Sequence, residues 1–141
     1  MNRLELNVMI TRVCAAIVQG NSILMVLHRH DGRSYWTLPG GGVDEGETPE
    51  QAVVREVKEE TDLHAGVIRI LFDEPFQNNT CRCFLLKVDE SQEAALGYDP
   101  EQAHLEVEAR MLCGVAWHTL ERMKNDCQVS QVLKHLPGSV R

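Results

Sequence analysis

The segment from Gly41 to Leu63, GGVDEGETPEQAVVREVKEETDL, concentrates the net charge of the chain and so restricts how it can fold. It holds eight carboxylates and two cations, a net charge of −6, whereas the other residues carry the remaining 13 acidic and 12 basic side chains. Like charges packed this closely repel one another and destabilise a folded segment unless an opposite charge offsets them. A bound divalent cation is the simplest such offset.

A helix is expected to begin at Pro49 within this segment. Thr48 is a favourable N-cap, proline suits the first helical position, and Gln51 completes a capping box. The helix has to end near Thr61, because Asp62 is one of the few non-glycine residues that enter the left-handed conformation readily.

Three glutamates of this helix, Glu56, Glu59 and Glu60, stand at positions i, i+3 and i+4, so their side chains project from one face. Three carboxylates in this arrangement can share a hard cation. Mg²⁺ suits them best, because it prefers oxygen ligands and is commonly held by carboxylates together with substrate phosphates. Glu47, on the preceding loop, could approach the same cluster. A solvated helix face is the alternative interpretation of an isolated E-x-x-E-E pattern.

The rest of the chain predicts mainly strands. Apolar residues at 12–19 and 22–29, separated by Gly20-Asn21, predict a hairpin. Both strands are apolar on both faces, which favours a sheet covered on each side, as in an α/β sandwich. We expect further strands at 35–38, 66–72, 81–88 and 111–117, short helices at 118–126 and 128–136, an acidic loop at 43–48, a turn-rich connection at 73–80 and a long loop at 89–110. The three glycines at 40–42 allow backbone conformations that are closed to other residues.

The length, the isoelectric point and the apolar runs of the chain exclude several classes of protein. A length of 141 residues fits one domain, so we expect residues 1–141 to form a single unit. A pI near 5.3 argues against a general nucleic-acid binder, and we expect no stable nucleic-acid complex. No apolar run approaches the roughly 20 residues that cross a bilayer, and the N-terminus lacks signal-peptide features, so no membrane association and a cytoplasmic location are expected.

The five cysteines are odd in number and scattered, without the paired spacing of a structural zinc site. We expect buried, reduced thiols. A redox role for Cys81 and Cys83, which fall on the same face of a predicted strand, is the alternative.

The acidic segment resembles the signature of the Nudix hydrolase family. Gly41 is followed after five residues by Glu47, and after seven more by Arg55-Glu56-Val57-Lys58-Glu59-Glu60-Thr61-Asp62-Leu63. Asp62 stands where the family usually has glycine, which affects the helix exit and removes no metal ligand. The segment 36–42, which leads into the signature, and the strand at 115–117 are also similar to segments that usually accompany the signature in this family.

The resemblance implies an α/β/α sandwich with a central mixed β-sheet. It also implies hydrolysis of the P–O–P bond of a nucleoside diphosphate linked to another group, by water, with Mg²⁺ or alternatively Mn²⁺ as cofactor. Such a site needs cations that neutralise the phosphates and lower the pKa of a bound water. We expect a small nucleotide-type substrate, such as a nucleoside triphosphate or a small nucleotide sugar.

Two points about assembly and activity stay open at this stage. The chain could form a homodimer. A non-catalytic nucleotide-binding or regulatory module with the same fold is the alternative function, although such modules usually lose glutamates that are all present here.

By the same resemblance, Glu56, Glu59 and Glu60 are the metal ligands. Arg55 is expected to form a salt bridge, with Glu47, that orients the glutamates rather than binding substrate. The general base stays open among several glutamates: Glu59, Glu60 and Glu47 of the signature, and Glu106 and Glu108 of the long loop.

Residues outside the carboxylate cluster are expected to contact the substrate. Gly40 and Gly41 let the backbone approach the phosphates. Arg29 and Arg33 flank the loop before Trp36, where an arginine could bind a phosphate bidentately, and surface charge is their alternative role. The aromatic candidates for stacking on a base are Trp36, Phe76 and Trp117, with core packing favoured for the two tryptophans.

Overall fold

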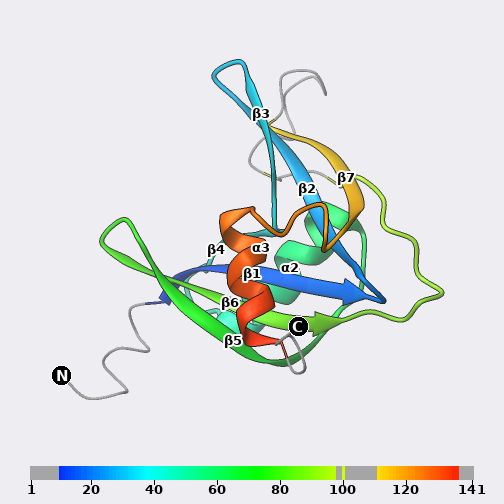
Figure 1. Ribbon diagram of the computed structural model, residues 1–141. Helices are drawn as coiled ribbons and strands as arrows, with labels where there is room; N and C mark the ends of the chain where they lie inside the picture. Colours follow the sequence, from blue (N-terminus) through cyan, green and yellow to red (C-terminus); the bar gives the residue numbers. More distant parts are fainter. Residues whose placement is uncertain (1–9, 98–99, 101–110, 137–141) are drawn as a thin grey trace.

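The computed structural model describes residues 10–97, 100 and 111–136 of the chain (Figure 1). Its elements in chain order are β1 (Ile10–Gln19), β2 (Ser22–His30), β3 (Arg33–Thr37), β4 (Gly40–Gly42), α2 (Pro49–Thr61), β5 (Gly66–Phe76), β6 (Asn79–Lys87), β7 (Leu112–Thr119) and α3 (Cys127–His135).

The strands form one mixed sheet in the order β3-β2-β1-β6-β5, with β4 added to β1 and β7 added to β2. Strand β1 is its centre: it runs parallel to β6 and antiparallel to β4. The expected hairpin of β1 and β2 is present, but the two strands pair only at Val18–Ile23 and Gln19–Ser22 before they diverge. Beyond that point β2 pairs with β3 and β7.

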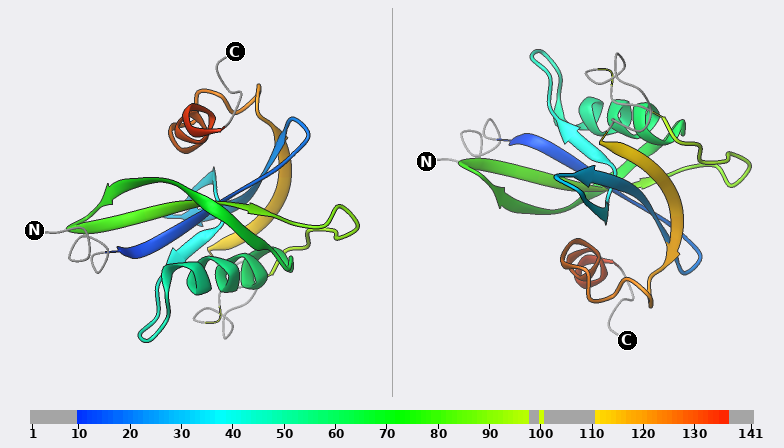
Figure 2. Two further views of the ribbon diagram at one scale, coloured as in Figure 1. Left: turned by 90° about the horizontal axis from the view of Figure 1, so that it is seen from below. Right: turned by 90° about the horizontal axis from the view of Figure 1, so that it is seen from above.

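The two helices cover opposite faces of this sheet (Figure 2). Successive side chains of a strand point to opposite faces, so β1 supplies both layers. The layer under α2 contains Val13, Ala15 and Ile17, and the layer under α3 contains Cys14 and Ala16. The α/β fold with a covered mixed sheet is therefore confirmed. Within the described part of the chain, neither helix is long and apolar enough to cross a membrane.

The three glycines at 40–42 form the short strand β4, which pairs with β1. Gly40, Gly41 and Gly42 lie opposite Cys14, Val13 and Arg12 of β1. A Cβ atom on Gly40 would stand 2.1 Å from the carbonyl oxygen of Val13, so the two backbones can approach this closely only without a side chain there.

The connection expected at 73–80 is mostly strand. Strand β5 continues to Phe76, β6 begins at Asn79, and the reversal occupies two residues, with Gln77 at φ 55°. Arg82 stabilises the extension by donating to both carboxylate oxygens of Asp73, at 2.8 and 2.9 Å. The charged and polar residues that predict a loop are instead paired across two strands.

The helix expected at 118–126 is absent from this described stretch. Strand β7 continues to Thr119, which pairs with Ser22, and residues 120–126 form turns. Helix α3 then begins at Cys127, because the Asp126 side chain caps it by accepting from the backbone N–H groups of Gln128 and Val129.

All five cysteines are free thiols. Cys14, Cys81 and Cys83 are buried as expected, whereas Cys113 is half-buried and Cys127 is exposed at the start of α3. The expectation of burial is therefore wrong for Cys127. A hydrogen bond with Cys14, together with burial, raises the pKa of the Cys81 thiol, which keeps it protonated and poorly nucleophilic.

Candidate active site

Helix α2 begins and ends through the residues that the sequence predicts. Thr48 Oγ1 accepts from the Gln51 backbone N–H at 3.1 Å, and Gln51 Oε1 accepts from the Thr48 N–H at 2.9 Å, which completes the capping box. Asp62 ends the helix at φ 63°, ψ 20°, and its N–H donates to the Lys58 carbonyl. The aspartate thus adopts the left-handed conformation that glycine would otherwise supply.

A distant segment packs on the last turn of α2. The N–H groups of Ala95 and Gly97 donate to the carbonyls of Thr61 and Glu60, at 2.8 and 2.9 Å. A Cβ atom on Gly97 would stand 1.7 Å from the carbonyl oxygen of Glu59. This contact satisfies carbonyls that a helix end leaves unpaired and holds the backbone that carries the glutamates.

Arg55 binds three of the glutamates at once. Its Nε and Nη2 donate to the two carboxylate oxygens of Glu47 at 2.7 and 3.0 Å, and Nη1 donates to Glu56 Oε1 and Glu59 Oε1 at 3.0 and 3.1 Å. Nη2 also donates to the Gly42 carbonyl at 2.9 Å. The expected ion pair with Glu47 is confirmed, and the five N–H groups of the guanidinium have five acceptors.

This pairing shifts the acid–base equilibria of both partners. The hydrogen bond to Glu47 raises the pKa of Arg55, with nearby Glu56 adding to the effect. The same bond lowers the pKa of Glu47 below its usual value of 4.5. Both side chains therefore stay charged over a wide pH range.

The glycine strand positions two glutamates, Glu60 and Glu56. Glu60 is buried, and its Oε1 accepts from the Gly40 backbone N–H at 3.0 Å. A Cβ atom on Gly41 would stand 2.5 Å from Glu56 Oε1, so the carboxylate occupies the space that glycine leaves. Strand β4 therefore links the carboxylates of α2 to the centre of the sheet.

Arg55, Glu56 and Glu59 line a pocket of about 400 Å³, which we call the acidic pocket. Its lining residues are Arg12, Gly41, Gly42, Asp44, Arg55, Glu56, Glu59 and Pro100. Carboxylate oxygens are the donors that a hard divalent ion prefers, so the donor set fits one. As placed, however, no three His, Cys, Asp or Glu side chains of the described residues come together as a metal site. Arg55 Nη1 instead bridges Glu56 and Glu59.

A second pocket, of about 210 Å³, lies against β1, β3 and α3, and we call it the α3-face pocket. Its lining includes Arg12, Cys14, Tyr35, Gly40, Phe76 and Gln128. Gln128 Oε1 accepts from Thr37 Oγ1 at 2.8 Å and from the Leu38 backbone N–H at 3.0 Å. A backbone N–H can only donate, so the accepting atom is the amide oxygen and the NH₂ group is left to donate elsewhere.

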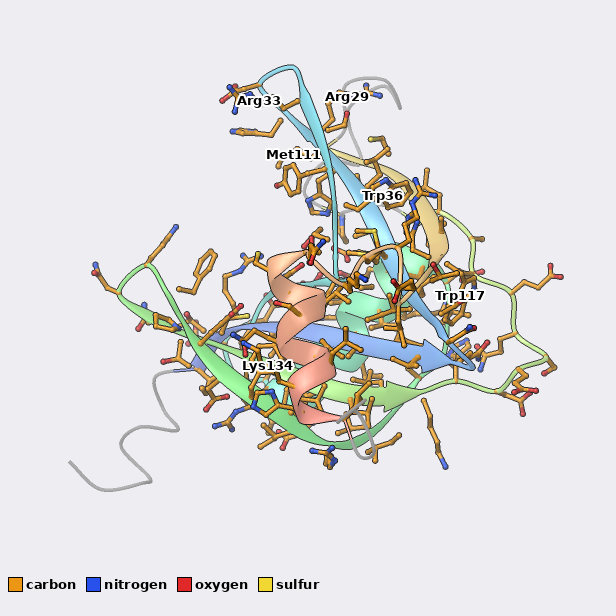
Figure 3. All side chains as sticks on the ribbon, in the orientation of Figure 1. Arg29, Arg33, Trp36, Met111, Trp117 and Lys134 are labelled. Atoms are coloured by element: carbon orange, nitrogen blue, oxygen red, sulfur yellow. The ribbon has the colours of Figure 1, made fainter. Side chains whose placement is uncertain are left out.

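The remaining predicted residues lie apart from these contacts. Figure 3 shows Arg29 and Arg33 near the outer end of the β2–β3 hairpin, and neither lines the acidic pocket. Their substrate role stays a prediction. Glu106 and Glu108 lie outside the described residues. Trp36 packs edge-on against His118, with ring centroids 4.4 Å apart.

Arg12 and Gln128 are among the residues of these pockets that sequence reasoning missed. Arg12 opens an apolar strand and Gln128 lies in a short amphipathic helix, and neither position differs locally from ordinary surface polarity. Gly97 carried a weak signal as a glycine within the long polar loop. The tight contact with the carbonyl of Glu59 explains that glycine.

A family model described as the NUDIX domain matches residues 9–136 of the chain. The chain belongs to the Nudix family. The Nudix signature therefore coincides with the strand–loop–helix that carries Gly41, Glu47, Arg55, Glu56 and Glu59 around the acidic pocket.

Curated relatives match part of this Nudix chain. An RNA pyrophosphohydrolase of Sphingopyxis alaskensis is 41% identical over 63 residues, which cover 43% of this chain and 40% of the relative. An RNA pyrophosphohydrolase of Sulfurovum sp. is 36% identical over 86 residues, covering 50% and 55%. The chain thus spans about half the length of these relatives.

Solved Nudix structures share the fold. An ADP-ribose pyrophosphatase from Streptococcus suis superposes with a TM-score of 0.63 at 22% identity, covering 89% of this chain and 92% of that one. A Nudix hydrolase from Nitrosomonas europaea gives 0.62 at 20% identity, covering 88% and 85%. At these identities the likeness shows the fold alone.

Proposed function

We propose that this Nudix chain hydrolyses a P–O–P bond of a nucleoside diphosphate linked to another group. The observation that carries the proposal is the Arg55 network, which holds Glu47, Glu56 and Glu59 around the acidic pocket. Curated relatives support it, since the matched proteins include RNA pyrophosphohydrolases.

Glu56, Glu59 and Glu60 would hold a divalent ion, Mg²⁺ in the first instance and Mn²⁺ as an alternative. When bound, such an ion neutralises phosphate charge and lowers the pKa of a water molecule. In the structure Arg55 Nη1 supplies the positive charge between Glu56 Oε1 and Glu59 Oε1. Arg55 therefore acts as a positioning residue, because all its N–H groups are directed to protein acceptors.

The signature glutamates differ in their suitability as general base. Glu60 is buried and already accepts from the Gly40 N–H, and Glu47 is engaged by two nitrogens of Arg55. Glu59 accepts from a single N–H and lines the pocket. We therefore assign the proton from the attacking water to Glu59. The water oxygen bonds to phosphorus as the bond to the leaving phosphate oxygen breaks.

The substrate is proposed to be a small nucleotide, with its diphosphate in the acidic pocket and its nucleoside in the α3-face pocket. Both pockets border strand β4, since Gly41 and Gly42 line one and Gly40 lines the other. The glycine backbone is thus accessible from both. The NH₂ group of Gln128, a residue that lines this pocket, would donate to an acceptor on the base.

The decisive experiment is product identification with a substrate panel in the presence of Mg²⁺. The panel contains nucleoside triphosphates, nucleotide sugars, dinucleoside polyphosphates and a short 5′-triphosphorylated RNA. Glu59→Gln and Glu60→Gln keep an amide oxygen for the existing hydrogen bonds and remove the charge. We expect turnover to fall by roughly 10²- to 10⁴-fold with the fold intact.

Glu50→Gln is the matched control, because Glu50 is an exposed carboxylate in the first turn of the same helix. It should retain full turnover. Unchanged turnover in Glu59→Gln and Glu60→Gln would contradict the assigned roles. Tight nucleotide binding by the unaltered protein without product after long incubation would favour the non-catalytic alternative.

A further inference from the structure

Arg12 connects the two pockets. It lies on β1, opposite Gly42 of β4 and Cys81 of β6. Among the described residues, it is the one side chain that lines both the acidic pocket and the α3-face pocket. Arg12 is therefore placed to contact a ligand that extends from one pocket to the other.

Arg12 also differs from Arg55 in its N–H donors, which are not directed to carboxylates of the described residues. The acidic pocket has two cations among its described lining residues, Arg12 and Arg55, and the five N–H groups of Arg55 are directed to protein acceptors. Within the described part of the chain, no carboxylate forms an ion pair with Arg12. Glu74 lines the α3-face pocket and lies outside ion-pair distance of it.

An aromatic ring holds the Arg12 guanidinium instead. Its Cζ atom lies 4.7 Å from the centroid of the Phe76 ring. A guanidinium packed on a ring face keeps its N–H edge available, and this planar edge suits bidentate binding of a phosphate. Phe76 is itself 37% exposed, so the pair lies at an accessible surface.

We propose that Arg12 is a substrate-binding residue that grips the phosphate next to the nucleoside, with Phe76 holding its guanidinium at the junction of the two pockets. The inference rests on the proposed function. It also explains how an anionic substrate enters a pocket lined by Asp44, Glu56 and Glu59, because Arg12 supplies a positive charge that no carboxylate of the described residues pairs with.

The test compares binding of three probes that need no turnover: an α,β-methylene nucleoside triphosphate, the nucleoside 5′-monophosphate and the free nucleoside. Titration calorimetry gives each Kd for the unaltered protein, Arg12→Gln, Arg12→Lys and Phe76→Leu. Arg12→Gln should weaken both phosphate-bearing probes by roughly tenfold to a hundredfold. Its affinity for the free nucleoside should not change.

The other variants separate charge, geometry and folding. Arg12→Lys keeps the charge without the planar fork and should lose less affinity than Arg12→Gln. Phe76→Leu should weaken the phosphate-bearing probes by a few-fold, since the guanidinium loses its support. Arg122→Gln, which removes an exposed arginine outside both pockets, is the charge-matched control and should bind like the unaltered protein. Melting temperatures establish that each variant is folded.

Two results would overturn the proposal. One is phosphate-probe affinity in Arg12→Gln equal to that of Arg122→Gln. The other is equal weakening of the nucleoside and the nucleotide, which would indicate a purely structural role. Failure of the proposed function is distinguishable, because it would appear as no product from the unaltered protein while Arg12 still governed probe binding.

Discussion

Asp62 shows how one residue can replace a glycine at a helix end. It holds a positive φ of 63°, and its carboxylate pairs with Lys58 one turn earlier. Lysine near the C-terminus of a helix also interacts favourably with its dipole. The aspartate thus offsets part of the conformational cost with a local ion pair, whose formation lowers the pKa of the Asp62 carboxyl.

Asp62→Ala should therefore be destabilising and Asp62→Gly should not. Alanine at this position keeps the energetic cost of the left-handed conformation and loses the ion pair. The melting temperature of the Asp62→Ala variant should therefore fall by about 2 to 6 °C. Glycine enters this conformation freely, so the melting temperature of the Asp62→Gly variant should equal or exceed that of the unaltered protein. Glu90→Ala, at an exposed acidic position, controls for the lost charge. Equal melting temperatures for Asp62→Ala and Asp62→Gly would contradict this account.

The Glu47–Arg55 pair should make stability depend on pH in the acid range. A carboxyl with a folded pKa below its unfolded value stabilises the protein above the unfolded pKa, here about 4.5, and loses that contribution as pH falls through the folded pKa. Glu47→Gln should lower the free energy of unfolding by about 1 to 3 kcal/mol at neutral pH, because it removes a charge-assisted bidentate contact.

The difference in the free energy of unfolding between Glu47→Gln and the unaltered protein should shrink progressively below pH 4.5. Over that range Glu47 becomes protonated first in the unfolded state and then in the folded state. Chemical denaturation across that range measures it. Glu45→Gln, an exposed neighbour on the same loop, is the control and should show little change at any pH. A difference that is constant with pH would mean that the pair does not stabilise through its charge.

At the scale of elements, strand β4 has a different steric environment at each of its three glycines. A Cβ on Gly40 would meet the Val13 carbonyl at 2.1 Å, one on Gly41 would meet the Glu56 carboxylate at 2.5 Å, and one on Gly42 would stand 4.0 Å from its nearest neighbour, the Thr11 carbonyl. Backbone cannot move aside as the end of a flexible side chain can.

Three alanine substitutions should consequently give three outcomes. Gly40→Ala should lower stability by about 3 kcal/mol or more, because β4 has to separate from β1. Gly41→Ala should fold with a small loss of stability, yet lose most of its turnover, since Glu56 has to leave its position. Gly42→Ala should melt like the unaltered protein. Melting curves and turnover of all three check this order, which would be contradicted if Gly42→Ala were the least stable.

At the scale of the whole molecule, most of the net charge of −7 lies in segment 41–63, which supplies the carboxylates of the acidic pocket, and Arg55 offsets part of it by contacting four carboxylates. A bound divalent ion should offset more and stabilise the native state. At a Mg²⁺ concentration of about 100 times its Kd, the melting temperature should rise by roughly 5 to 10 °C.

The stabilisation by Mg²⁺ should be lost in Glu56→Gln and retained in Glu50→Gln. Sodium chloride at matched ionic strength controls for general screening of the carboxylates, and it should give a smaller rise. A melting temperature indifferent to millimolar Mg²⁺ would argue against a metal site in the folded protein.

The sequence by itself determined the bounds of α2 and the apolar centre of the sheet. Each of these depends on residues within a few positions of one another, as Thr48, Gln51 and Asp62 do at the two helix ends. Local hydrogen bonds and side-chain periodicity decide such features, so they can be predicted without the rest of the molecule.

Tertiary structure alone decided the pairing of β4 with β1, the extension of β5 and β6 through their polar residues, and the two pockets. Gln128 reaches Leu38 across 90 positions of sequence, and Arg12 acquires its place between the pockets from strands β4 and β6 on either side. Such contacts form because the chain closes on itself around a shared core, and no local pattern records which distant backbone will supply the partner.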